Sequence, residues 1–279
     1  SMKNVSIKTE SYRDLEVTSI VTAGIEVNGG RAGDPASYYQ EDGRFEKIGG
    51  TIISIVLIGA DLPSYSLVRA AMTATEAKTC ALQQLMAPSR YSDGIATGSG
   101  TDMVAIVSNG ESKLKLTDSG KHSKLGEMIG NTVLNATIEA LDRQSDLNAH
   151  TQMDLLIRLE RYHKDERDIW RAAFSIGGEN RRSKFNDNLA ELRKDPLLVA
   201  STGAILHICD EVSWGLIPEA SGKKTALSLM GGIGHYACPS SSIPLDRILS
   251  ERDTILDNWI RIIAWIIKNG RRGEQHVQT

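Results

Sequence analysis

The segment TIISIVLIGA, residues 51–60, is an almost uninterrupted apolar run rich in β-branched side chains. It shows no polar alternation after Ser54, which is typical of a central strand covered on both faces. A helical period follows at once, from Pro63 to Met86, with the proline at its first turn. A buried strand followed directly by a long helix indicates an α/β fold.

The same alternation of strand and helix patterns extends over residues 16–143. EVTSIVTAG, residues 16–24, and MVAIVS, residues 103–108, have the composition of strands. A second helix is expected to begin near Ser123, a good N-cap residue. The sequence therefore predicts an α/β N-terminal domain over residues 1–146, with a mixed sheet and packed helices.

Each of these two helices carries an apolar stripe that we expect to pack on the sheet. The first stripe consists of Val68, Ala71, Met72, Thr75, Thr79, Leu82 and Met86, and the second of Leu125, Met128, Ile129, Val133 and Ala136.

Residues 147–279 contain no convincing strand pattern, so the sequence predicts an all-α C-terminal domain or extension of unknown role. Helical periods are expected over residues 151–175, 184–193, 196–212, 223–237 and 245–268. The last of them carries four apolar residues that we expect to be exposed and to mediate a homodimer: Trp259, Ile260, Ile263 and Ile267.

Composition excludes several classes of partner. The net charge of -3 and the 24% of charged residues describe an ordinary surface, so we expect no nucleic-acid partner. The chain has three cysteines and no CxxC pair, which indicates a reducing compartment. Its N-terminal residues lack a secretory pattern, so we expect a cytoplasmic protein. The apolar residues 255–267 are interrupted by Asp257 and Arg261, so no membrane span is expected.

Four segments carry polar or glycine-rich patterns that suit a ligand site. The first, TAGIEVNGGRAGDP at residues 22–35, follows a strand and contains Asn28, Arg31 and Asp34 among its glycines. A glycine-rich turn with solvated charges explains it equally well. The third segment, ATGSGTD at residues 96–102, is suited to holding an anion through backbone N–H groups, but it lacks the pattern of a P-loop.

The second and fourth segments carry the candidate acid and base groups. The second segment, RAAMTATEAKT at residues 69–79, places Arg69, Thr73 and Glu76 along one edge of the first helix, and Lys78 falls on the opposite flank. A surface Arg–Glu arrangement is the simpler interpretation of that edge. The fourth segment, GKHSKLGE at residues 120–127, places a histidine at a helix N-terminus, where proton transfer or anion binding is favoured, although a capped helix with an exposed histidine has the same pattern.

Metal ligation has weaker support in the sequence. His207 lies two residues before Cys209, and His235 lies three residues before Cys238. Neither pair has a carboxylate cluster or the CxxC spacing of a metal site, so buried structural side chains explain both better and no metal site is predicted.

Taken in order, the four segments and the apolar strand resemble the adenosylcobinamide amidohydrolase (CbiZ) family over residues 16–143. The resemblance implies hydrolysis of the amide that joins aminopropanol to a corrin ring, in cobalamin (vitamin B12) salvage. The corrinoid would be the substrate and would bring its own cobalt, so no further cofactor is required. A corrinoid-binding or regulatory protein without hydrolysis, and an amidohydrolase of another substrate, remain alternatives.

The resemblance and the chemistry of amide hydrolysis together assign roles to the motif residues. We expect Glu76, His122 and Lys78 to be catalytic, the first two as base and acid and the third as a stabiliser of negative charge. An activated water or a hydroxyl of Thr22, Thr73 or Ser123 would be the nucleophile. The substrate-binding residues would be Thr22, Gly24, Asn28, Arg31, Asp34, Thr73, Thr97, Gly98, Ser99, Gly100, Thr101, Asp102, Lys121 and Ser123. All four segments are expected to line one cleft.

Overall fold

The computed structural model describes residues 2–36, 49–237 and 243–269. The chain divides into two compact units, Ser1–Gln152 and Met153–Thr279. This division falls six residues after the boundary expected at 146/147. We call the two parts the α/β unit and the helical unit.

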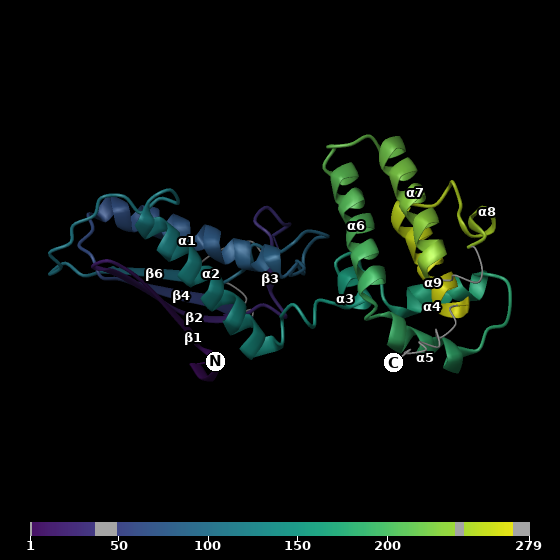
Figure 1. Cartoon of the computed structure of the whole chain (residues 1–279), viewed down its shortest axis with the longest axis horizontal. Helices are drawn as coiled ribbons and strands as arrows, with labels where there is room; N and C mark the ends of the chain where they lie inside the picture. The colour runs from purple at the N-terminus through teal and green to yellow at the C-terminus, as the bar shows by residue number, and fades with distance from the viewer. Residues whose placement is uncertain (1, 37–48, 238–242, 270–279) are drawn as a thin grey trace, which may run out of the picture. The chain divides into compact units, whose positions relative to one another are not determined.

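The α/β unit is a four-stranded sheet with two long helices on one of its faces (Figure 1). In chain order its elements are η1 (Met2–Asn4), β1 (Ser6–Tyr12), β2 (Leu15–Gly24), β3 (Gly29–Gly30), β4 (Thr51–Ile58), α1 (Ser64–Gln84), β5 (Gly98–Ser99), β6 (Met103–Ser108) and α2 (Lys124–Ser145). The strand order is β1-β2-β4-β6, in which β6 is parallel to β4 and the other neighbours are antiparallel. The predicted mixed sheet with packed helices is confirmed.

Helix α2 begins where the sequence places it. The Ser123 side chain accepts a hydrogen bond from the Gly126 amide at 3.1 Å, which satisfies one of the free N–H groups at the helix start. The predicted inward stripe of this helix is buried, from Leu125 to Ala136. Helix α2 packs mainly on β2 and on α1.

The predicted stripe of α1 is wrong in phase. Val68 and Met72 are 65% and 60% exposed, whereas the buried face of the helix is built from alanines. These are Ala70, Ala74, Ala77 and Ala81. Small side chains let α1 approach α2 and the sheet closely, so Val68 and Met72 are left on the outer face; Leu82 is the residue of the predicted stripe that is fully buried.

The prediction that the 51–60 strand is covered on both faces is also wrong. β4 is central, but Ile53 and Leu57 point away from the helices and are 38% and 39% exposed. The strand β1 was not predicted. It forms a hairpin with β2 through a tight turn in which Arg13 has a φ of 53°. Inside the strand Ile7 is the single large apolar side chain, so the alternation of apolar and polar residues is too weak to predict a strand.

The helical unit has no strand among its described residues, as predicted. Its elements are α3 (Leu155–Glu160), α4 (Glu166–Ser175), α5 (Arg182–Leu192), α6 (Pro196–Ser213), α7 (Glu219–Ala237), α8 (Leu245–Ile248) and α9 (Ile255–Asn269). Two of the expected helices are each split in two, at residues 161–165 and 249–254. The first break contains His163 with a φ of 55°, and a capping box at Asp165 starts the next helix. None of the described helices is both long and apolar enough to cross a membrane.

Helix α9 is the centre of the helical unit and not an exposed face. Trp259 and Ile263 are fully buried, and Ile260 and Ile267 are at most 4% exposed. Helices α4, α5, α6, α7 and α8 all pack against α9. A helix that is apolar on most of its circumference is typical of a domain core, so the predicted dimer contact through these four residues is wrong.

A buried ion pair joins α6 to the end of α3. Both guanidinium nitrogens Nη1 and Nη2 of Arg161 donate to the Asp210 carboxylate, at 2.9 and 2.7 Å, and the Tyr162 hydroxyl donates to Asp210 at 2.7 Å. Burial, reinforced by that hydrogen bond, raises the pKa of the Tyr162 hydroxyl well above its ordinary value. The carboxylate is therefore the anchor of the network.

We predict that Asp210→Ala destabilises the helical unit by about 3–5 kcal/mol, because it leaves the Arg161 charge buried without its partner. All four tryptophans lie in this unit, so guanidinium denaturation followed by tryptophan fluorescence reports its stability separately. Arg167→Ala is the control. Its exposed pair with Asp165, at 3.9 Å, is expected to contribute no more than about 1 kcal/mol. Equal losses in the two variants would contradict the anchoring role.

Candidate active site

Asp102 joins three parts of the α/β unit. Its carboxylate forms an ion pair with the ammonium group of Lys78 on α1, and both side chains are largely buried. It also accepts hydrogen bonds from the Ile52 amide at 3.2 Å and from the amide and hydroxyl of Ser99 at 3.0 and 2.6 Å. One carboxylate therefore ties the second and third motif segments to the first residues of β4.

The first and third segments pair as a short antiparallel ribbon, β3 with β5. Gly29 lies opposite Ser99, and Gly30 lies opposite Gly98. Beyond the ribbon, the Ala32 amide donates to the Thr97 hydroxyl at 2.9 Å. The Thr97 carbonyl in turn accepts from the Thr79 hydroxyl on α1 at 3.0 Å.

Gly50 is surrounded by polar groups of the same segments. Its carbonyl accepts from the Asn28 side-chain amide at 2.8 Å and from the Thr101 hydroxyl at 2.7 Å. Gly50 has a φ of 90°, and a Cβ at this position would stand 2.5 Å from the Asn28 side-chain oxygen, so only glycine fits. At the start of the segment, Gly24 lies at the end of β2 with Gln144 of α2 close to it.

Asp34 closes the first segment onto residues that the sequence analysis did not single out. Its carboxylate accepts from the hydroxyls of Ser89 and Ser92, each at 2.5 Å, and from the Arg31 amide at 2.7 Å. Partial burial by itself raises the pKa of the Asp34 carboxyl, but these hydrogen bonds outweigh it and hold the pKa below its usual value. The serines lie in a turn-rich stretch whose composition indicates a loop but not its partner.

The fourth segment meets α1 on its other flank. Lys121 Nζ lies 2.6 Å from a Glu76 carboxylate oxygen, with 64% and 48% of the two side chains exposed. The neighbouring His122 is exposed, and its side chain has no hydrogen bond or ion pair to any described residue. Thr73 is buried and donates to the Ser119 carbonyl at 3.0 Å, while the Ser123 hydroxyl donates to the Gly120 carbonyl at 2.9 Å.

The four segments form two groups on opposite flanks of α1. Segments one and three lie where β4 and β6 begin, whereas α2 and the segment before it start beyond the opposite end of these strands (Figure 1). Glu76 and Lys78 occupy opposite flanks of α1, as predicted, so Glu76 faces Lys121 while Lys78 faces Asp102. Thr22 lies on the sheet face that points away from both helices. Thr22 therefore lies outside any cleft that Glu76 lines, and the expectation of a single cleft lined by the four segments stays a prediction.

The outer face of α1 connects the two groups. Tyr65, Val68 and Met72 are each at least 60% exposed and run along the side of the helix next to Glu76. Further along, Thr75 is exposed and Thr79 reaches the Thr97 carbonyl. Val68 and Met72, which the sequence assigned to the core, thus form exposed apolar surface beside Glu76.

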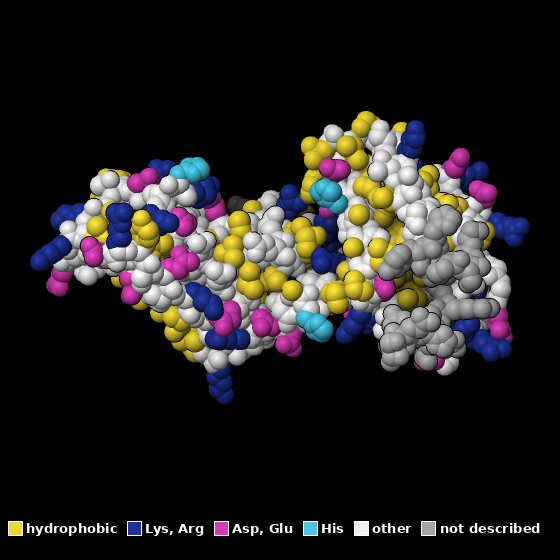
Figure 2. Space-filling model, in the orientation of Figure 1, with side chains coloured by type: hydrophobic (Ala, Val, Ile, Leu, Met, Phe, Trp, Pro, Cys, Tyr) yellow, Lys and Arg dark blue, Asp and Glu magenta, His cyan; other side chains and the backbone are white. Residues whose placement is uncertain are grey.

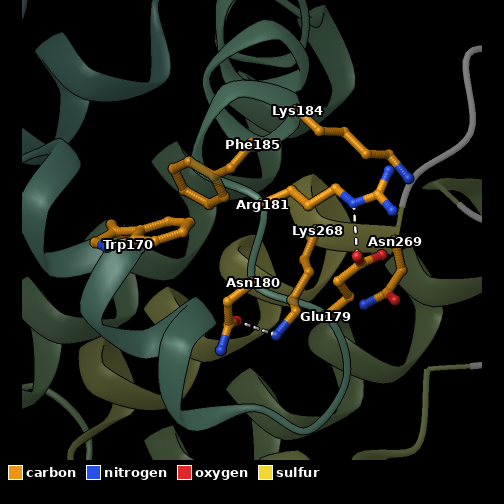
Figure 3. A pocket seen from close by; sticks show the side chains of 8 residues that line it. All are labelled: Trp170, Glu179, Asn180, Arg181, Lys184, Phe185, Lys268 and Asn269. Atoms are coloured by element: carbon orange, nitrogen blue, oxygen red, sulfur yellow. Dashed lines mark hydrogen bonds and ion pairs between the residues drawn. The ribbon is translucent and has the colours of Figure 1, made fainter.

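A pocket of about 130 Å³ in the helical unit is too small for a large ligand (Figure 3). Trp170, Phe185 and Lys268 are among the residues that line it. The Lys268 ammonium group already donates hydrogen bonds to the carbonyls of Ala173 and Ile176 and to the side chain of Asn180. It therefore caps the C-terminal end of α4.

The described residues offer no ready metal site. No three side chains of histidine, cysteine, aspartate or glutamate come together among them with metal-binding geometry. Burial raises the pKa of Cys209 to about 11, so this thiol stays protonated near neutral pH. The side chains of His235 and Cys238 lie outside the described residues. Figure 2 shows acidic and basic side chains interspersed on the face that it presents.

These observations define a two-layer α/β protein whose glycine- and hydroxyl-rich segments are tied to its first long helix. The chain belongs to the adenosylcobinamide amidohydrolase (CbiZ) family, whose model matches residues 1–149, which is more than half of the chain. The resemblance stated from the motifs is confirmed.

One curated relative is itself uncharacterized. The chain is 34% identical over 159 residues to an uncharacterized protein of Methanocaldococcus jannaschii. The match covers 53% of this chain and 62% of the relative, so the chain spans less than two thirds of that protein's length. No solved structure matches the chain.

We predict that Gly98→Ala destabilises the α/β unit by about 1–3 kcal/mol, because its Cβ would collide with the Asp102 carboxylate and the Lys78 ammonium. Gly100→Ala is the matched control from the same segment, since its Cβ would meet nothing within 4 Å. Urea denaturation followed by far-ultraviolet circular dichroism measures both. If Gly98→Ala is as stable as Gly100→Ala, the Lys78–Asp102 ion pair moves aside at little energetic cost and the prediction is wrong.

We predict that the stabilisation due to Asp34 is lost in acid. Its folded-state pKa is lowered, so its contribution is present above the unfolded-state pKa of about 4 and disappears as the pH falls through the folded value. Asp34→Asn should therefore lower the free energy of unfolding most near neutral pH. The control is Glu111→Gln, which removes one carboxylate from an exposed position. If the difference in the free energy of unfolding between the two variants stays constant with pH, the prediction is wrong.

Proposed function

We propose that the protein hydrolyses the amide that joins aminopropanol to the corrin ring of adenosylcobinamide, as a step of cobalamin salvage in the cytoplasm. Family membership supports the reaction class. The observation that carries the assignment of the site is the Glu76–Lys121 ion pair with His122 beside it, because it presents acid and base groups on an exposed surface. We propose that the corrinoid supplies the cobalt and that no other cofactor takes part.

The proposed chemistry is attack by water on the amide carbonyl. The water oxygen forms a bond to the carbonyl carbon while its proton passes to the Glu76 carboxylate. The ammonium group of Lys121 and the N-terminus of α2 stabilise the negative charge that develops on the carbonyl oxygen. The bond from carbon to nitrogen then breaks, His122 protonates the leaving nitrogen, and the products are adenosylcobyric acid and 1-aminopropan-2-ol.

Water is favoured over a protein hydroxyl as the nucleophile. The hydroxyls of Thr73 and Ser123 donate to backbone carbonyls, and Thr73 is buried. Thr22 lies on the other face of the sheet from Glu76. None of the three is therefore both exposed to a substrate and adjacent to the proposed base.

Lys78 and the outer face of α1 have positions from which they can hold the glycine-rich segments and the substrate in place. Lys78 is bound to Asp102 and is only 6% exposed, so we propose that it positions the glycine-rich segments and does not touch the substrate. The apolar outer face of α1, with Tyr65, Val68 and Met72, suits the flat face of a corrin macrocycle. We propose that the substrate lies along this face, with its amide near Glu76.

We predict that Glu76→Gln lowers kcat for adenosylcobinamide by about a hundredfold or more, because it removes the base. The matched control is Glu166→Gln, which breaks an exposed ion pair of the same 2.6 Å length with Arg182 in the helical unit. It should leave kcat unchanged. Chromatographic detection of adenosylcobyric acid measures the rate.

The same assay separates the candidates. Normal turnover by Glu76→Gln together with loss of turnover by His122→Ala would transfer the essential role to the histidine. Normal turnover by both variants would remove this cluster from the mechanism. Binding of adenosylcobinamide without any turnover by the unaltered protein would favour a corrinoid-binding or regulatory function.

A further inference from the structure

The sheet of the α/β unit has helices on one face only. Helices α1 and α2 both pack on the same side, where Val17, Val56 and the other inward residues of the strands are buried (Figure 1). On the opposite side the outward residues of all four strands alternate with them and remain exposed or partly exposed. We call this second side the open face.

The open face is apolar where an uncovered sheet is ordinarily polar. Its apolar residues come from every strand and are Ile7, Ile20, Ile53, Ile55, Leu57, Met103, Ala105 and Val107. Met103 is 66% exposed, Ile7 57% and Val107 50%. Contiguous apolar surface of this kind marks an interaction site in a soluble protein.

We propose that the open face is the contact between two copies of this chain, which form a dimer by packing sheet against sheet. Its charge pattern favours self-association, because Glu16 is the single charged residue among the outward positions of the four described strands. A two-fold axis that lies between the faces and runs across the strands would set each Glu16 over the Thr22 end of the other copy. The two carboxylates would then not meet.

The size of the face is suited to a dimer. Four strands about 4.8 Å apart, each about seven residues long with a rise of about 3.3 Å, give a flat footprint of roughly 450 Å² per copy. Counted on both copies this flat footprint is roughly 900 Å², slightly below the lower bound of about 1,000 Å² for a biological interface, and the relief of the side chains adds to it. Face-to-face packing of twisted sheets at about 10 Å is a standard arrangement, and a two-fold axis makes it self-complementary.

The test is sedimentation velocity of the full chain at micromolar concentration. We expect a dimer for the unaltered protein and a Kd at least about 30-fold weaker for Ile55→Lys, which places an unpaired charge near the centre of the contact, in register with Ile20 and Ala105. Leu216→Lys is the matched control. It adds the same charge at a residue of the helical unit that is 66% exposed, and should leave the dimer intact.

A second variant keeps the test decisive if Ile55→Lys fails to fold by circular dichroism. Val107→Lys alters the edge strand β6, where a lysine is readily accommodated in a monomer, and should also weaken the dimer. A monomeric unaltered protein would overturn the proposal and indicate that the face is covered within the chain or by another partner. Folded lysine variants that remain dimeric would overturn it as well.

Discussion

The ion pair between Lys78 and Asp102 is the interaction on which the α/β unit depends. It joins α1 to the loop before β6, and the same carboxylate holds the start of β4 by accepting a hydrogen bond from the Ile52 amide. Breaking a buried pair by removing one partner typically costs about 3–5 kcal/mol, which is a large share of the stability of a domain. The glycine-rich segments thus keep their positions because a helix, a strand and a loop share one buried charge.

The elements of the fold were predictable where local chemistry decides them. The N-cap at Ser123 and the apolar run of β4 fix one helix and one strand without help from the rest of the chain. Burial of particular faces was predicted correctly for α2 but not for α1 or β4, because it depends on what packs nearby. In α1 the closeness of α2 and the sheet selects mostly alanines for the interior, so Val68 and Met72, which a hydrophobic pattern emphasises, lie outside, whereas Leu82 is buried.

The same limit applies to the candidate site. Motif order identified the family, and the helical repeat placed Glu76 and Lys78 on opposite flanks of α1, as the structure has them. The sequence did not reveal that the partner of Lys78 is Asp102, since their proximity depends on how the chain returns to the sheet after α1. It also gave no sign that the fourth segment lies at the other end of the sheet, because that position follows from the order and direction of the strands.

The division of the chain near residue 152 has a consequence for synthesis. The first unit is compact by itself, and the match to the family ends at residue 149. Because a chain emerges from the ribosome N-terminus first and domains fold as units, the sheet and its two helices can assemble while the helical unit is still being made. The last part of this unit to emerge is α2, which packs on β2 and α1. Until α2 arrives, one side of the nascent sheet lacks part of its cover, and this is the interval in which a chaperone would protect the chain most.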